Sequence, residues 1–412
     1  MKKSWSLLWL VILAGCAPRH DTGLQEGIWR GALQRADGIE IPFNFEVKDS
    51  LGKPVVEIIN GAGRMRVDSI RQQGDTLHIH MPFFDSDFEA LLQKDGSLKG
   101  RWIKHYPDSD RVLGFAATPH TGYRLVESPG KAQQDVSGRW AATFTSLDRK
   151  DTLQAVGEFH QDAGQVTGTF LTVSGDYRYL AGVMDGDTLK LSTFDGSHVY
   201  LFRALATGDS LLSEGMFYAG FSGVTRWEAR RDSTAHLPDA FSLTTFRPGQ
   251  EKLAFSFPDL QGNPVSLADD RFRDKAVIVQ IMGSWCPNCM DETQFMSDWY
   301  RRNRSRGVEV IGLCYERSTD YDQAVSQVLT FKRRFDVQYP LLITGVTPSD
   351  PHLLEKTLPQ LQHFVGFPTT IFIDREGHIA RIHAGFSGPG TGAHYQAYIR
   401  EFNHIVDQLV GD

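Results

Sequence analysis

Residues 277–289 constrain the fold of this 412-residue chain more than any other stretch. Residues 277–282 are almost wholly apolar, which is typical of a strand buried on both faces of a sheet. Gly283-Ser284 ends this run, and a Cys-Pro-Asn-Cys motif follows at residues 286–289. From Met290 onward, aromatic and apolar residues recur at helical spacing. The sequence therefore predicts a strand, a Cys-x-x-Cys turn and a helix in direct succession.

This order of elements suits cysteine redox chemistry. Cys286 would lie at the helix N-terminus, where unpaired amides and the helix dipole favour a thiolate. Pro287 fits the first helical position because it gives up no hydrogen bond there. Two intervening residues allow Cys289 to reach back and close a disulfide with Cys286. We expect Cys286 to be the attacking and more exposed thiol, and Cys289 to be the resolving thiol.

Two other interpretations of the motif are half of a zinc site and a purely structural disulfide. A zinc site would need a second Cys-x-x-Cys or a pair of histidines at finger spacing, and neither follows in the sequence. We therefore expect no metal here, and the redox pair is the preferred interpretation.

The N-terminal residues 1–15 have the features of a signal peptide. Lys2 and Lys3 precede a short apolar run, and small residues follow it. The end of this segment resembles the lipobox of bacterial lipoproteins, which implies cleavage before Cys16 and lipidation of that cysteine. An ordinary secretory signal is the alternative. We expect a tether over residues 16–24 and a cell-envelope protein that is held at the membrane by lipid and faces the periplasm.

The net charge of −7 argues against a nucleic-acid partner, which would need a basic face. The two basic runs, residues 301–306 and 332–334, fall at the ends of predicted helices, where cations complement the dipole. Further helices are expected over residues 321–335, 353–365 and 393–410. Cys314 ends another strand-like run, and we interpret it as a small core residue.

Residues 25–232 predict a tandem antiparallel β region. Short alternating runs are separated by turn residues throughout, without helical periodicity. The second half, residues 129–232, repeats landmarks of the first half, residues 25–128: Gly27-Ile28-Trp29 recurs as Gly138-Arg139-Trp140. The copies are either two small β domains or two halves of one larger sheet. His78 and His80 share one strand face, where a surface pair is favoured over a metal site.

A polar stretch over residues 233–253 predicts a linker, and residues 254–412 then resemble a known family. The resemblance is to the TlpA/ResA-like branch of the thioredoxin superfamily, membrane-tethered thiol–disulfide oxidoreductases of the bacterial envelope. Three motifs carry it: a short hairpin before the core, the segment 283–289, and residues 367–374, Phe-Pro-Thr-Thr-Ile-Phe-Ile-Asp. The expected fold is therefore multidomain: the β region followed by an α/β thioredoxin-like domain.

The resemblance also assigns roles to individual residues. It implies that Pro368 is a cis-proline facing the redox pair, so that Phe367 offers strand-like hydrogen bonds to a substrate peptide. Trp285 and Pro287 would belong to the same substrate surface. Glu316 matches, within one position, an acidic residue near the redox pair of such proteins, and would take a proton from Cys289; a surface carboxylate is the alternative.

Glu292 matches a second acidic position of the family, and we interpret it as a structural acid favoured by the helix dipole.

The sequence thus predicts an enzyme that reduces, or isomerises, disulfides of exported proteins through a Cys-Pro-Asn-Cys dithiol. No metal, flavin or nucleotide cofactor is implied, because the electrons pass through the cysteine pair. A membrane electron donor is expected to recharge the pair. Two alternatives remain open: an envelope lipoprotein whose β repeats bind a ligand or partner, with an auxiliary redox domain, and a redoxin-type peroxidase.

Overall fold

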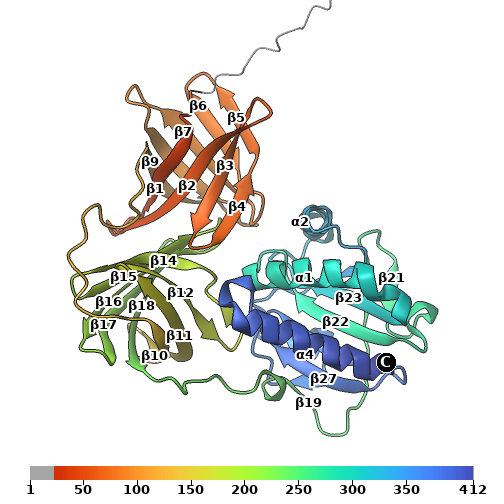
Figure 1. Ribbon diagram of the computed structural model, residues 1–412. Helices are drawn as coiled ribbons and strands as arrows, with labels where there is room; N and C mark the ends of the chain where they lie inside the picture. Colours follow the sequence, from red (N-terminus) through yellow and green to blue (C-terminus); the bar gives the residue numbers. More distant parts are fainter. Residues whose placement is uncertain (1–22, 412) are drawn as a thin grey trace, which may run out of the picture.

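The computed structural model describes residues 23–411, which form two β barrels and a C-terminal α/β domain (Figure 1). The predicted signal peptide and the lipidation site Cys16 lie outside the described residues. Within residues 23–411, no helix combines the length and apolar character needed to cross a membrane.

The first barrel is a nine-stranded up-and-down sheet. Its strands are β1 (Gly27–Gln34), β2 (Glu40–Ser50), β3 (Lys53–Asn60), β4 (Gly63–Val67), β5 (Ser69–Gln73), β6 (Thr76–His80), β7 (Ser86–Leu92), β8 (Leu98–Lys104) and β9 (Arg111–Pro119). The first strand pairs with the last, and the two edge strands, β4 and β5, are joined by a single residue. Alternate side chains point inward and fill the barrel with aromatic and aliphatic residues.

The second barrel repeats this plan. Its strands are β10 (Gly138–Ser146), β11 (Thr152–Asp162), β12 (Gln165–Thr172), β13 (Gly175–Asp176), β14 (Leu180–Asp185), β15 (Thr188–Phe194), β16 (Val199–Thr207), β17 (Leu211–Ala219) and β18 (Gly223–Arg231). Pairing of β10 with β18 and of β11 with β12 closes the sheet on itself. The tandem β region is therefore two separate barrels, each with its own core, and not two halves of one sheet.

The repeated tryptophans hold equivalent places in the two barrels. Trp29 and Trp140 lie on the first strand of each barrel and are almost fully buried. Each indole nitrogen donates to the carbonyl four residues earlier, Gln25 for Trp29 (2.8 Å) and Val136 for Trp140 (2.9 Å). The repeated sequence landmark thus marks a buried ring that also fixes the chain entering the barrel.

The C-terminal domain is built on a five-stranded sheet. Its strands are β22 (Ala276–Met282), β23 (Val308–Cys314), β24 (Leu341–Ile343), β26 (Thr369–Ile373) and β27 (Ile379–Ala384), in the order β24-β23-β22-β26-β27. Strand β22 is parallel to β23 and antiparallel to β26. All seven of its residues are buried, as the apolar run predicted.

Helices and loops cover both faces of this sheet. Helices α1 (Pro287–Asn303), α2 (Tyr321–Arg334) and α4 (Ala393–Val410) contribute to the core on one face. The other face packs against the short hairpin β20 (Ser256–Pro258)–β21 (Pro264–Ser266) and against helix α3 (Leu353–Thr357). Cys314 is fully buried in the first of these cores, as expected for a core residue.

Two segments differ from their predicted structure. The helix expected over residues 353–365 stops at Thr357, because Pro359 cannot continue a helix and restricts the residue before it. The chain instead forms β25 (Leu361–Gln362). This strand pairs with β19 (Thr245–Phe246), so part of the expected linker is joined to the C-terminal domain.

Candidate functional site

The two cysteines of the motif are bonded at the start of helix α1. Cys286 and Cys289 form a disulfide with their Cα atoms 5.2 Å apart. Cys286 is the N-cap residue, and its sulfur accepts the backbone N–H of Cys289 at 3.2 Å. This helix-end amide would stabilise a thiolate at Cys286 once the disulfide is reduced. Pro287 occupies the first helical position, where its missing N–H costs nothing.

Both sulfurs are shielded from solvent, though unequally. Cys289 is 0% exposed and Cys286 is 5% exposed. The expected order of exposure is present, but Cys286 is more enclosed than an attacking thiol on an open surface would be.

The segment before strand β26 faces the redox pair. The peptide bond between Phe367 and Pro368 is cis, as the resemblance implied. The carbonyl oxygen of Phe367 lies 3.8 Å from the sulfur of Cys286. The Phe367 ring packs edge-on against Trp285, with ring centroids 5.5 Å apart, and the Trp285 indole donates to the carbonyl of Tyr315 at 2.8 Å. Residues from three segments that are distant in the sequence thus surround Cys286.

Glu316 supports the turn that carries Cys286. One of its carboxylate oxygens accepts the backbone N–H of Ser284 at 2.9 Å, and the other accepts the Ser284 hydroxyl at 2.7 Å. Burial raises the pKa of this carboxyl above its ordinary value. Among the hydrogen bonds of the described residues, none joins Glu316 to Cys289. Proton transfer from Cys289 to Glu316 therefore stays a prediction.

Glu292, interpreted from the sequence as a structural acid, lies about one helical turn after Cys289 and is fully buried. Its carboxylate accepts hydrogen bonds from Gln280 (2.8 Å), Thr370 (2.6 Å) and Tyr398 (3.0 Å). Burial raises the pKa of Glu292 to about 6. The sequence could not reveal this, because the partners come from two strands and the last helix.

The second barrel contacts the redox face through the turn between β12 and β14. A Cβ placed on Gly175 would lie 1.9 Å from the side-chain nitrogen of Asn288, inside the Cys-Pro-Asn-Cys motif. The next residue, Asp176, accepts the backbone N–H of Gly388 at 2.8 Å. Two regions that are far apart in the sequence therefore meet at the site.

A buried charged cluster holds this junction together. Arg178 of the second barrel pairs with Asp291 of helix α1 (3.1 Å) and with Asp195 (3.5 Å). Asp195 also binds His198 at 2.9 Å. Burial raises the pKa of Asp291 to about 6, which the neighbouring Arg178 only partly offsets. The guanidinium thus bridges two domains in a poorly solvated setting.

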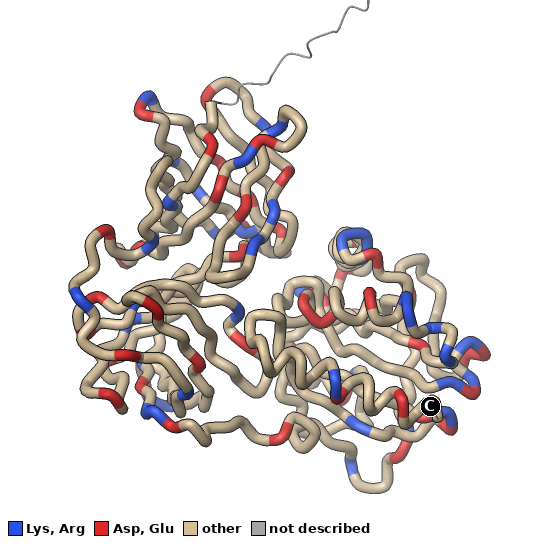
Figure 2. The backbone as a smooth tube through the Cα atoms, in the orientation of Figure 1, with Lys and Arg blue, Asp and Glu red and all other residues tan. Residues whose placement is uncertain are grey.

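Charged residues of both signs are spread over the described part of the chain. Figure 2 shows basic and acidic residues interspersed over both barrels and the C-terminal domain. Within residues 23–411, no three His, Cys, Asp or Glu side chains gather as metal ligands would. His80 instead binds Asp87 at 2.8 Å, and His78 lies exposed on the same strand.

The similarity of this chain to known proteins lies in its C-terminal domain. Residues 248–382 match the AhpC/TSA family. The thiol-disulfide oxidoreductase ResA of Bacillus thuringiensis subsp. konkukian is 25% identical over 153 residues, covering 37% of this chain and 77% of the relative. ResA of Halalkalibacterium halodurans is 26% identical over 161 residues, 39% of this chain and 77% of the relative. Both similarities are confined to about two-fifths of the chain.

Among solved structures, the similarity again covers about two-fifths of this chain. A putative thiol:disulfide interchange protein DsbE from Chlorobium tepidum has a TM-score of 0.30 at 18% identity, covering 39% of this chain and 99% of that one. The C-terminal domain of a putative thiol-disulfide oxidoreductase from Bacteroides thetaiotaomicron has a TM-score of 0.30 at 13% identity. The match covers 39% of this chain and 97% of that one. The protein is multidomain, with a β-rich N-terminal region and a thioredoxin-like C-terminal domain in which residues 248–382 match the AhpC/TSA family.

Proposed function

We propose that this protein is a thiol–disulfide oxidoreductase that reduces, or isomerises, disulfides of exported proteins. One observation carries the proposal: the Cys286–Cys289 pair begins helix α1 and faces the carbonyl of Phe367 before cis-Pro368. The names of the relatives, ResA thiol-disulfide oxidoreductases, support the same reaction class.

The reaction begins with the reduced pair. The Cys286 thiolate attacks one sulfur of a substrate disulfide, forms a mixed disulfide and releases the other substrate sulfur, which takes up a proton. The Cys289 thiolate then attacks the sulfur of Cys286, and the second substrate thiol leaves. The substrate gains two electrons and two protons, and the enzyme ends with the Cys286–Cys289 disulfide. A membrane electron donor would return the two electrons.

The neighbouring residues would orient the substrate and the nucleophile. An extended substrate segment would hydrogen-bond to the backbone of Phe367 beside Cys286, against the rings of Phe367 and Trp285. Glu316 would hold the Ser284 turn so that Cys286 keeps its place at the helix end. Pro287 would fix the start of the helix.

The location proposed for this reaction is the cell envelope, facing the periplasm, with lipid on Cys16 as the membrane anchor. Residues 1–16 support this proposal through their composition alone. Labelling growing cells with a radioactive fatty acid would test it. Incorporation into the protein, lost in Cys16→Ala, is the expected result, and incorporation that survives the substitution would exclude this anchor.

The equilibrium between the cysteine pair and a glutathione buffer tests the proposed function. A potential near the thioredoxin end of the range, roughly −270 mV, is expected of a dedicated reductase. A value near roughly −120 mV would make the protein an oxidant, and a pair that never forms a disulfide would exclude a redox role. Turnover of hydrogen peroxide as fast as that of disulfides would instead assign a peroxidase.

A further inference from the structure

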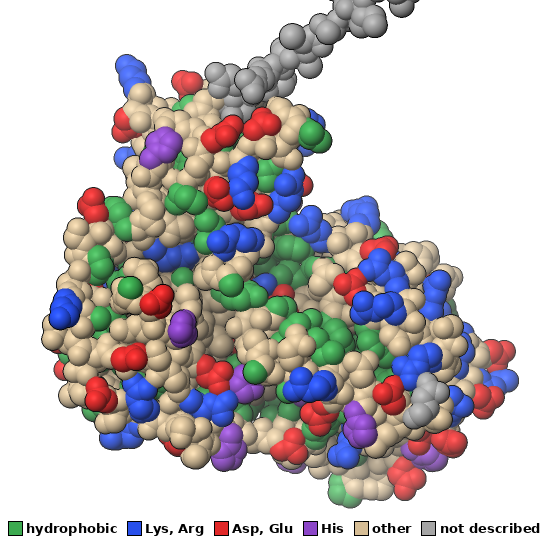
Figure 3. Space-filling model, in the orientation of Figure 1, with side chains coloured by type: hydrophobic (Ala, Val, Ile, Leu, Met, Phe, Trp, Pro, Cys, Tyr) green, Lys and Arg blue, Asp and Glu red, His purple; other side chains and the backbone are tan. Residues whose placement is uncertain are grey.

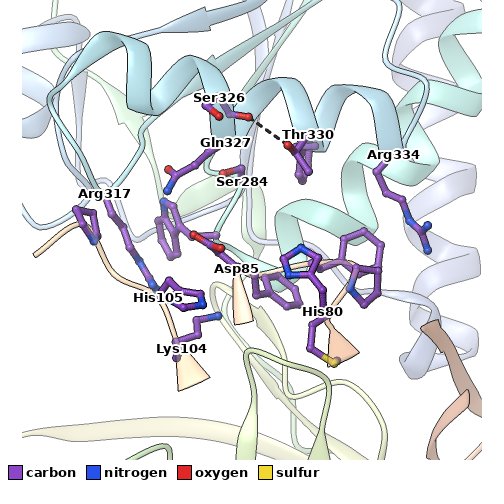
Figure 4. A pocket seen from close by; sticks show the side chains of 17 residues that line it. His80, Asp85, Lys104, His105, Ser284, Arg317, Ser326, Gln327, Thr330 and Arg334 are labelled. Atoms are coloured by element: carbon purple, nitrogen blue, oxygen red, sulfur yellow. Dashed lines mark hydrogen bonds between the residues drawn. The ribbon is translucent and has the colours of Figure 1, made fainter. Parts of the chain in front are cut away.

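A hollow lies between the first barrel and the C-terminal domain. It is a cavity of about 220 Å³, bordered by the β6–β7 turn, the end of β8, helix α2 and the residues just before the redox pair. Figure 4 shows side chains from both domains converging on it, including Lys104, Arg317 and Arg334. Figure 3 shows hydrophobic side chains gathered where the first barrel faces the C-terminal domain.

The cavity wall carries three cations without an ion-pair partner among the described residues. The ammonium group of Lys104 donates to the carbonyl of Gly196 at 3.0 Å. The Arg317 guanidinium lies 5.1 Å from the Trp285 ring centroid, and that of Arg334 lies 5.0 Å from Phe83. Aromatic faces hold the two guanidinium groups in place, and no carboxylate of the described residues lies within ion-pair distance of them.

Three carboxylates lie near these cations without forming an ion pair with them: Asp85 and Asp195 attract Lys104, and Glu316 attracts Arg317. Asp85 is the single carboxylate on the wall among the described residues. His80 and His105 each bond to Asp87 at 2.8 Å, and His105 also bonds to Asp110. These partners raise the pKa of both histidines, which increases the fraction that is protonated.

Lys104 is the most unusual of the three cations, because only 4% of its surface is exposed. Burial lowers the pKa of its ammonium group to about 7. A buried cation without an ion pair is costly to maintain, so the group is only partly protonated near pH 7 despite the attraction of Asp85 and Asp195. An anion arriving in the cavity would remove this cost.

The size and position of the cavity narrow the class of ligand. It is smaller than the roughly 300–1,000 Å³ of pockets for drug-sized molecules, so it suits one or two side chains. Ser284 and Trp285, which lie directly before Cys286, form part of its wall. A polypeptide whose disulfide reaches Cys286 would therefore pass this cavity.

We propose that the cavity is a substrate subsite that takes acidic side chains flanking the disulfide to be reduced. This inference rests on the proposed function and adds a substrate class to it: proteins with Asp or Glu close to the reactive cysteine. Aromatic rings contact the apolar part of the side chain, and Lys104, Arg317 and Arg334 bind the carboxylates.

Two matched peptide pairs test the proposal. In the first pair, two disulfide peptides differ only in having Glu or Gln beside one cysteine, and the rate of their reduction is measured. In the second pair, serine replaces every cysteine, and binding is followed by calorimetry, which needs no redox activity. The Glu peptides should be preferred by about fivefold or more in both measurements, as for a charge-assisted contact. Since the whole protein carries a charge of −7, overall attraction cannot produce this preference.

Arg334→Gln and Lys104→Met should each reduce the preference by about threefold or more and leave the Gln peptides unaffected. Arg333→Gln is the matched control, because Arg333 is an exposed neighbour on the same helix that does not border the cavity. Equal binding of the Glu and Gln peptides would overturn the subsite. Reduction of the Glu and Gln disulfide peptides at the same rate would also overturn the subsite, but it would leave the proposed function intact. Acid-selective binding without any disulfide reduction supports the subsite and excludes the proposed function.

Discussion

Gly175 of the second barrel lies directly against Asn288 of the Cys-Pro-Asn-Cys motif, with room for no side chain between them. Its neighbour Ser174 lies beside Gly366, just before the cis-proline segment, and Val173 lies beside Gly385. One turn of a β barrel therefore contacts three segments around the redox pair. This arrangement encloses the face on which the proposed substrates would react.

Gly175→Ala should open this face. Gly175 has a φ of +145°, and its added Cβ would lie 1.9 Å from Asn288. Overpacking of this kind costs roughly 1–3 kcal/mol, so the closed position of the turn should become at least about fivefold less populated. The expected result is faster reaction of reduced Cys286 with a bulky protein disulfide, measured by stopped-flow fluorescence.

Gly186→Ala is the control for this experiment. Gly186 lies in the same barrel and also has a positive φ, +64°, but nothing lies within 4 Å of its added Cβ. It tests an alanine at a positive φ in the same barrel without the clash. Equal rates for Gly175→Ala and the unmodified protein would show that the turn does not limit access.

Arg178→Leu should weaken the junction between the second barrel and helix α1. The change leaves Asp291 and Asp195 buried near one another without the shared guanidinium. Removing one partner of a buried ion pair costs about 3–5 kcal/mol. Denaturant unfolding should show this loss, and limited proteolysis should cut between the domains earlier. Arg226→Leu, an exposed position of the same barrel, should have little effect, and similar losses for both would count against the junction.

The two cysteines should behave differently when replaced one at a time. Cys289→Ser removes the resolving thiol, so the mixed disulfide between Cys286 and a substrate should accumulate. Cys286→Ser should form no such adduct and should lose disulfide reduction. Mass spectrometry of the trapped species checks both outcomes. Cys314→Ser is the control and should react as the unmodified protein does, because burial raises the pKa of Cys314 and keeps it a thiol. An adduct on Cys314 in the Cys289→Ser protein would contradict the assignment.

Glu292 should make the stability of the oxidised protein depend on pH. Burial raises the pKa of Glu292 from 4.5 to about 6, so the unfolded chain releases this proton at lower pH than the folded protein. The contribution of Glu292 to the free energy of unfolding is therefore largest below about pH 4.5. It falls by roughly 2 kcal/mol as the pH rises through about 6.

Glu292→Gln should remove that part of the pH dependence. Denaturant unfolding at pH 4.5 and at pH 7, with the disulfide intact in both proteins, measures the difference. Asp291 contributes in the same direction, since burial also raises its pKa to about 6, and it is unchanged in the variant. Parallel pH profiles for the two proteins would show that Glu292 does not titrate in this range.

Local sequence patterns determined much of the secondary structure and the repeat organisation of this protein. The apolar run before Cys286 predicted a buried strand, and Pro287 fitted the first position of the helix that follows. The repeated landmarks around Trp29 and Trp140 marked two copies of one β unit. These features could be predicted because each depends on residues within a few positions of one another.

Tertiary structure decided how these parts meet. It placed Gly175 against Asn288, buried Glu292 among residues from other elements, and brought Lys104 to a cavity beside Trp285. Such contacts join residues separated by tens to hundreds of positions, and they follow from how complete domains pack. No local periodicity encodes them, because the free energy of each contact depends on surfaces that exist only after every domain has folded.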